Sequence, residues 1–160
     1  SALIDYDYIM DLIARYAGTP SKMKMTKDQL VSLVSSSANL IDERDDIIAY
    51  IDSLEGVNGK TEQEIKAGYE VFKTEKFAKE LIAIADNHNL SVASLQSFVH
   101  AIVDRKIFDG EKLSELVVPL ELGWKERAKK ETAIMTDLIP LLKRMVGGQK
   151  ISGLSAYEEK

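Results

Sequence analysis

Residues 124–146 read WKERAKKETAIMTDLIPLLKRMV, the longest helical pattern in the chain. Apolar residues recur in it every three or four positions, which is the spacing that puts side chains on one face of an α-helix. We predict a long amphipathic helix that bends at Pro140, because proline lacks the N–H that the preceding turn needs, and that ends at Gly147 and Gly148. The predicted buried stripe contains Trp124, Ala128, Met135, Leu138, Leu142 and Val146.

The same helical spacing continues through the rest of the chain, without the sustained alternation that marks a half-buried strand. Thr26 with Gln29, and Thr61 with Glu64, have the spacing of capping boxes that begin helices. The sequence therefore predicts an all-α fold: a single compact domain of about seven or eight helices over residues 1–150, which is not a simple four-helix bundle, followed by a flexible tail over 151–160. The predicted helices before residue 124 end near Ala17, Val34, Leu54, Phe72, Asn87, Ile102 and Leu116, the last stopped by Pro119.

The composition is that of an ordinary globular protein, with 45% hydrophobic and 29% charged residues in a chain of 160. The absence of cysteine excludes disulfides, thiolate nucleophiles and cysteine-bound zinc. No apolar run approaches the length of a membrane span, and the N-terminus lacks the pattern of a signal peptide. We therefore expect a cytoplasmic protein with no membrane partner, and the missing initiating methionine suggests a piece of a longer chain.

Charge is distributed unevenly along the chain, whose net charge is −5. Residues 1–62 carry eleven acidic and six basic side chains, whereas residues 63–160 carry fifteen of each. Residues 122–150 hold seven basic side chains against three acidic ones. The overall charge argues against wrapping of nucleic acid, so any contact with a polyanion should lie at this C-terminal end.

The predicted helix over 124–146 carries a basic arc opposite its apolar stripe. Lysine side chains on a rigid helix can hold phosphates without reading bases. The same arc could instead contact a partner protein, or could serve only to solvate the outer face of the helix. The residues of this basic arc are Lys125, Lys129, Lys130, Lys143 and Arg144.

No other group of residues predicts a catalytic, cofactor or metal site. Gly59-Lys60-Thr61 matches the end of a phosphate-binding loop, but Leu54 replaces the required glycine, so a turn capped by Thr61 is favoured. The acidic residues at positions 42, 43, 45 and 46 lack the spacing of a calcium loop and are expected to form a solvated face. His88 and His100 have no metal-ligand spacing, and the serines at 35–37 have no histidine partner.

Several stretches of the second half of the chain resemble one family. They are Ala78–Leu90 (AKELIAIADNHNL), Leu95–Val99 (LQSFV), Ile107–Pro119 (IFDGEKLSELVVP) and Trp124–Lys130 (WKERAKK). Together they resemble the C-terminal region of the motor (restriction, HsdR) subunit of type I restriction-modification enzymes. The segments LIARY at 12–16 and IIAYIDSL at 47–54 are compatible with the same region.

The resemblance implies a parent enzyme that is an ATP-dependent type I site-specific deoxyribonuclease. Such a parent uses ATP and Mg²⁺, translocates double-stranded DNA, and works with a methyltransferase core of modification and specificity subunits. Its nuclease and motor motifs do not occur in this chain, so no catalytic residue is carried over and no cofactor is expected in this segment. The implied role is to dock the motor subunit onto the core, to contact double-stranded DNA, or both. The alternative is a structural or regulatory module without DNA contact.

Overall fold

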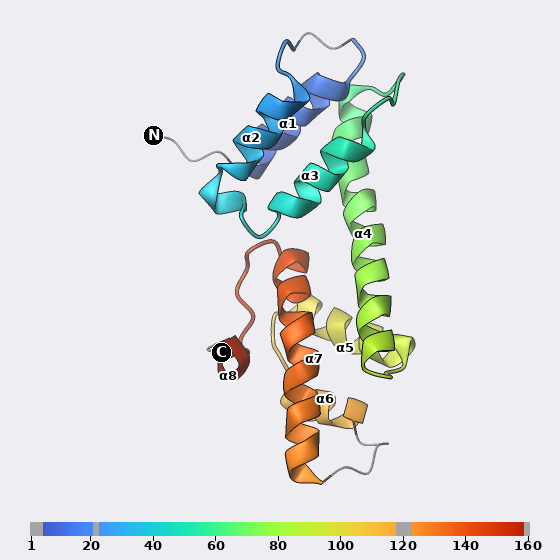
Figure 1. The fold of residues 1–160 in the computed structure, drawn as a ribbon, viewed down its shortest axis with the longest axis vertical. Helices are drawn as coiled ribbons and strands as arrows, with labels where there is room; N and C mark the ends of the chain where they lie inside the picture. The colour runs from blue at the N-terminus through green and yellow to red at the C-terminus, as the bar shows by residue number, and fades with distance from the viewer. Residues whose placement is uncertain (1–4, 21–22, 118–122, 159–160) are drawn as a thin grey trace. The chain divides into compact units, whose positions relative to one another are not determined.

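The computed structural model describes residues 5–20, 23–117 and 123–158, which form eight α-helices and one short 3₁₀ helix (Figure 1). The predicted all-α, multi-helix fold is confirmed. The elements are α1 (Tyr6–Ala17), α2 (Lys27–Ser35), the 3₁₀ helix η1 (Ala38–Leu40), α3 (Arg44–Ser53), α4 (Glu62–Asn87), α5 (Val92–Arg105), α6 (Gly110–Val117), α7 (Trp124–Met145) and α8 (Ser155–Glu158).

The two predicted capping boxes are confirmed. In the first, the Thr26 hydroxyl accepts from the backbone N–H of Gln29 at 3.2 Å, and the Gln29 side chain accepts from the N–H of Thr26 at 2.9 Å. Thr61 and Glu64 exchange the same pair of bonds at 3.1 Å each and begin α4. Gly59-Lys60-Thr61 is therefore the turn that leads into this helix, as the sequence predicted.

Helix α4 corrects the prediction of two helices here, one ending near Phe72 and the next near Asn87, with Thr74 expected to cap the second. The Thr74 hydroxyl does not cap a new helix but donates to the backbone oxygen of Glu70, one turn earlier, at 2.9 Å. Neither glycine nor proline occurs between residues 69 and 87 to break the helical backbone. A threonine that bonds within its own helix is tolerated there, and so one helix of 26 residues replaces two.

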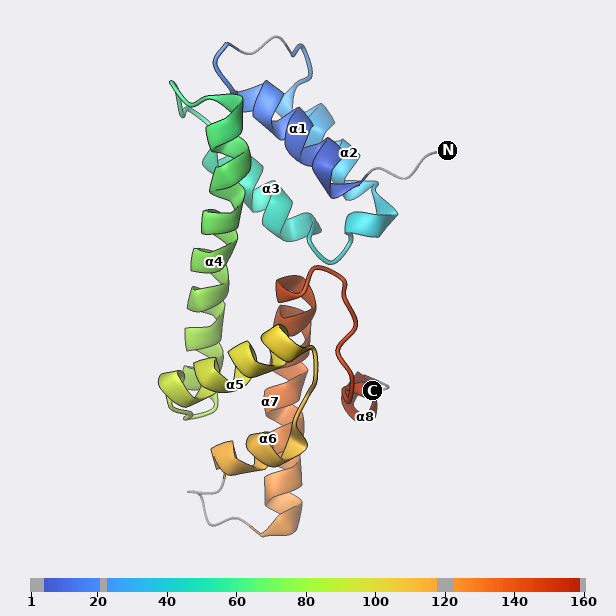
Figure 2. The ribbon, with the colours of Figure 1, turned by 180° about the vertical axis from the view of Figure 1, so that it is seen from behind.

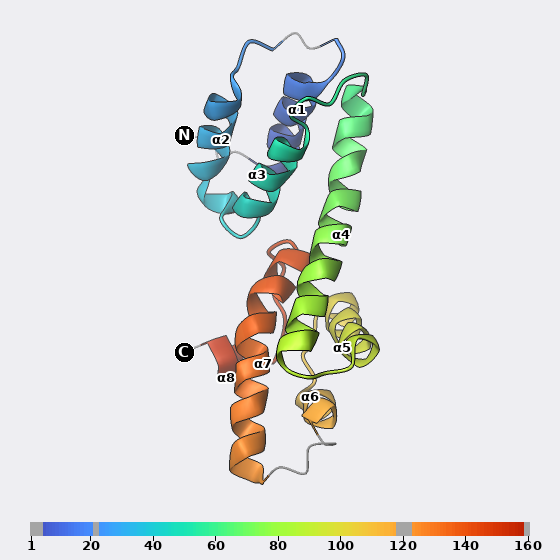
Figure 3. The same cartoon turned by 45° about the vertical axis from the view of Figure 1, so that its right-hand side comes forward.

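The chain divides into two compact units, residues 1–75 and 76–160, and the division falls inside α4. In the first unit, α1, α2 and α3 pack together (Figure 3), and their apolar faces meet residues from the start of α4. The buried side chains of this core include Ile9, Ile13, Leu30, Ile47, Ile51, Ile65 and Tyr69.

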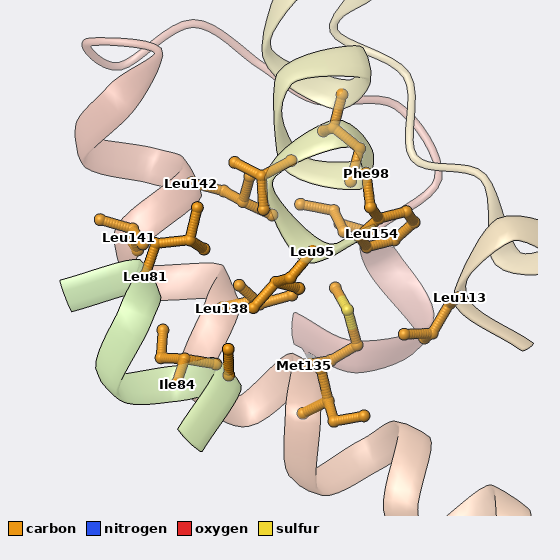
Figure 4. Close-up of a cluster of buried hydrophobic side chains, with 14 of the residues drawn as sticks. Leu81, Ile84, Leu95, Phe98, Leu113, Met135, Leu138, Leu141, Leu142 and Leu154 are labelled. Atoms are coloured by element: carbon orange, nitrogen blue, oxygen red, sulfur yellow. The ribbon is translucent and has the colours of Figure 1, made fainter. Parts of the chain in front are cut away.

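The second unit is built around α7. Helix α5 crosses α7 (Figure 2), and α6 and α8 also pack on α7. Figure 4 shows side chains of α5, α6, α7 and the end of α4, together with Leu154, meeting in one core. Leu95, Leu113, Met135, Leu138 and Leu142 are fully buried there.

Residues 151–158, in the segment predicted as a tail, pack on the second unit. Ile151 and Leu154 are buried, and the Tyr157 ring meets the Phe108 ring edge-on at 5.6 Å. The backbone approaches Phe108 closely at Gly153, whose φ of +93° is accessible mainly to glycine. This segment packs because its apolar residues, Ile151, Leu154 and Tyr157, recur every three positions and so can contact the core together.

Among the residues that the structure describes, no helix is both long enough and apolar enough to span a membrane.

The second core yields a test of the α7 packing. Truncating Leu138 to alanine removes a fully buried side chain and should lower the free energy of unfolding by about 2–5 kcal/mol. Thr136→Ala, on the exposed side of the same helix, should change it by less than about 0.5 kcal/mol. Urea unfolding followed by circular dichroism measures both, and similar effects of the two changes would contradict the assigned orientation of α7.

Candidate nucleic-acid interface

The buried side of α7 decides which of its residues can reach a ligand. Met135, Leu138 and Leu142 are buried as predicted, but Trp124 is 77% exposed and Ala128 is exposed as well. The predicted stripe is therefore buried only from Met135 onward, where Ile134 joins it in the core. The first turns of α7 are exposed because α6 contacts α7 farther along, where the Ser114 hydroxyl donates to Glu131 at 2.8 Å.

Three members of the predicted basic arc, Lys125, Lys129 and Lys143, lie on the outer face of α7, and we call them the lysine strip. All three are exposed. Lys125 and Lys143 are five helical turns apart, so they point in the same direction about 27 Å from each other. Helical periodicity places Thr132, Thr136 and Pro140 between the lysines, and no acidic residue of α7 falls on this line.

The ion pair between Glu126 and Lys129 neutralises little of the charge of the lysine strip. Lys129 Nζ lies 3.5 Å from Glu126 Oε1, and the two side chains are 76% and 63% exposed. Ion pairs this exposed contribute less than about 1 kcal/mol and are screened by salt. The Nζ of Lys125 lies 5.4 Å from the centre of the exposed Trp124 ring.

Arg144 and Lys130 are placed differently from the strip. The guanidinium of Arg144 donates two hydrogen bonds to the Glu80 carboxylate, at 2.7 and 2.6 Å, and lies 5.1 Å from the Phe77 ring. Its side chain is only 18% exposed, so it joins α7 to α4. Lys130 is half-buried at the flank of the helix. The structure thus divides the predicted arc into an exposed strip and an internal anchor.

The Arg144 guanidinium holds the pKa of the Glu80 carboxyl below its usual range, because it donates hydrogen bonds to the charged form. Lys76 adds a second cation 3.2 Å from the same carboxylate. A second pair joins α7 to the turn that follows α4, since His88 Nε2 lies 2.7 Å from Asp137 Oδ2. Asp137 therefore faces α4, and its charge is directed away from the lysine strip.

Of the acidic residues at positions 42, 43, 45 and 46 that were predicted to form a solvated face, Asp42 and Asp45 are exposed, but Glu43 and Asp46 are not. Asp46 is fully buried, and Glu43 pairs with Lys73 at 3.5 Å with both side chains about 15% exposed. Burial raises the pKa of Glu43, and the nearby Lys73 opposes that rise. The prediction was wrong for Glu43 and Asp46 because α3 and α4 pack over these two side chains. Among the described residues, no three acidic, histidine or cysteine side chains are grouped to hold a metal ion.

The chain matches a family model described as type I restriction and modification enzyme, subunit R, C terminal, over residues 1–145. Comparison with curated proteins and with solved structures gives no match.

The Glu80–Arg144 pair predicts a pH dependence of stability. A carboxyl whose pKa is lowered by folding stabilises the protein above its unfolded pKa, and this contribution is lost as the pH falls through the folded value. Glu80→Gln should therefore destabilise the chain near pH 7 and have a smaller effect near pH 3. Urea unfolding at both pH values measures the difference; an effect that grows toward low pH would contradict the pair.

Proposed function

Since the chain belongs to the family of C-terminal domains of type I restriction enzyme R subunits, we propose that it contacts duplex DNA through the lysine strip and helps to join its subunit to the methyltransferase core. The strip is the observation that carries the DNA role. The alternative remains a structural or regulatory module whose lysines are only solvated.

The geometry of the strip suits phosphates better than bases. Three ammonium groups spread over about 27 Å of helix match roughly eight base-pair steps of a duplex at 3.4 Å each. Each phosphate that a lysine neutralises releases counterions, which gives affinity without sequence preference. The hydroxyl of Thr132 lies on the same line and can also bond a phosphate oxygen, whereas the Thr136 hydroxyl already donates to the backbone oxygen of Thr132 at 2.8 Å. The strip offers neither the bidentate arginine nor the amide side chains that read bases in the major groove.

The net charge of −5 limits this contact to one surface. Duplex DNA approaching any acidic face is repelled, so binding by the chain alone should be weak and strongly dependent on salt. Weak contact that does not depend on sequence suits a subunit that must remain on DNA of any sequence as the DNA moves. The enzyme as a whole then supplies the specificity.

The assembly role is supported by the exposed start of α7. Trp124 presents a large aromatic side chain to solvent, and tryptophan is among the residues most enriched at the centres of protein interfaces. Burying its ring against a partner would remove a large apolar area from water. The ring lies beside Lys125, so docking and DNA contact would be neighbours on this helix.

Charge reversal tests the DNA role. Changing Lys125, Lys129 and Lys143 together to glutamate should abolish binding to a random-sequence duplex, measured by fluorescence anisotropy at low salt. Neutral replacement of the three by glutamine should weaken binding and reduce the slope of log affinity against log salt by about 2.7.

The matched control reverses Lys24, Lys60 and Lys79, which are also exposed, so that the net charge changes equally. This control should keep most of the affinity. Equal losses in both triple variants would mean that only total charge matters, and unchanged binding by the strip variant would exclude the strip as the DNA contact.

Assembly is tested in the complete R subunit, compared with a subunit that lacks this segment. We expect the truncated subunit to hydrolyse ATP but to associate less tightly with the methyltransferase core in sedimentation velocity. Trp124→Ala should weaken association in the same direction, whereas Tyr8→Ala, which also removes an exposed aromatic side chain, should not. Full association by the truncated subunit would contradict the assembly role.

A further inference from the structure

A groove on the second unit, away from the lysine strip, has the features of a peptide-binding site. A cleft of about 370 Å³ lies between α5 and α6, with Phe98, Ile102 and Leu116 among its apolar lining. A second, more open hollow adjoins it, and the two share Arg105, Ile107 and Asp109. Arg105 is the last residue of α5, and Ile107 and Asp109 lie in the connection to α6, so the two hollows form one groove across this connection.

The backbone at Ile107 has one paired edge and one free edge. Ile107 forms a parallel bridge with Ser152, in which the Phe108 N–H donates to the Ser152 oxygen and the Ser152 N–H donates to the Lys106 oxygen, both at 2.9 Å. In this pattern the N–H and C=O of Ile107 itself point away from Ser152. Within the described residues, neither group has a hydrogen-bond partner. The Ile107 side chain is 56% exposed.

The charges around the groove single out Arg105. Its side chain is exposed and forms no ion pair with the described residues, and arginine can hold a carboxylate with two parallel hydrogen bonds. Lys112, Glu115 and Asp109 have partners, whereas the exposed Glu111 side chain, which lines the second hollow, forms no ion pair with the described residues. Lys112 and Glu115 pair with each other at 3.6 Å, and the Asp109 carboxylate accepts from the backbone N–H groups of Glu111 and Lys112 at the start of α6.

We propose that this groove binds an extended peptide segment of a partner protein. The peptide adds a short strand to the free edge of Ile107, places apolar side chains in the hollows on either side, and presents a carboxylate to Arg105. Each part of the site supplies one of these requirements: a backbone donor and acceptor that no described residue pairs, apolar walls, and a cation without an ion pair among the described residues. The proposal is independent of the lysine strip and of DNA binding.

The test uses the whole 160-residue chain, labelled with ¹⁵N, and the blocked peptide acetyl-Thr-Val-Glu-Val-Thr-amide. Backbone amide shifts should move at Ile107 and at residues lining the groove, with a dissociation constant on the order of 1 mM, as expected for a few hydrogen bonds and two small side chains. Arg105→Gln should weaken binding about fivefold, whereas Arg105→Lys, which keeps the charge, should retain more of the affinity. Shifts that are absent, or that lie elsewhere on the chain, overturn the proposal.

Two altered peptides separate the contributions without changing the protein. Replacing the peptide's glutamate by glutamine should weaken binding to the unaltered chain about fivefold, and should have no further effect on the Arg105→Gln variant, because the two changes remove the same interaction. Methylating every peptide nitrogen removes the donors that strand addition needs and should abolish the shifts. Additive effects of the two charge removals, or undiminished binding by the methylated peptide, contradict the site.

Discussion

The apolar side of α7 is buried against α5, α6 and the end of α4, and this burial determines what the helix presents to solvent. Met135, Leu138 and Leu142 cannot turn outward without leaving the core. Because side-chain direction repeats every 3.6 residues, the position of Leu138 also fixes the direction of the lysine strip. Glu80 of α4 pairs with Arg144, and His88, just after α4, pairs with Asp137, so both pairs hold the same rotation of α7.

The helices could be predicted largely from local sequence, because their ends depend on local chemistry. The Thr26 and Thr61 capping boxes are read directly from spacing, whereas Thr74 has the same residue type but bonds within its helix. Residue type alone does not distinguish these two uses of threonine. The division of the chain into two units gave no sequence signal, since it falls inside a continuous helix with no linker composition.

The candidate site was predicted in outline only. Helical periodicity found the basic arc, but the Arg144 partner, Glu80, is 64 residues away in the sequence, and no local pattern shows such a contact. Glu43 and Asp46 were misread for the same reason, because their burial depends on packing between α3 and α4. Buried charges are expensive unless they are paired, so the Lys73–Glu43 pair is a condition for closing that core. The Ile107 backbone likewise could not be recognised from local sequence, because its conformation depends on the bridge to the distant Ser152.

The composition of the lysine strip has a kinetic consequence. Exposed side chains change rotamer in picoseconds to nanoseconds, whereas a typical enzyme completes about ten cycles per second. An ammonium group at the end of a flexible stem can therefore leave one phosphate and reach the next many times during a single cycle. A duplex held by such groups would move along α7 with little friction, whereas rigid bidentate contacts would resist each step.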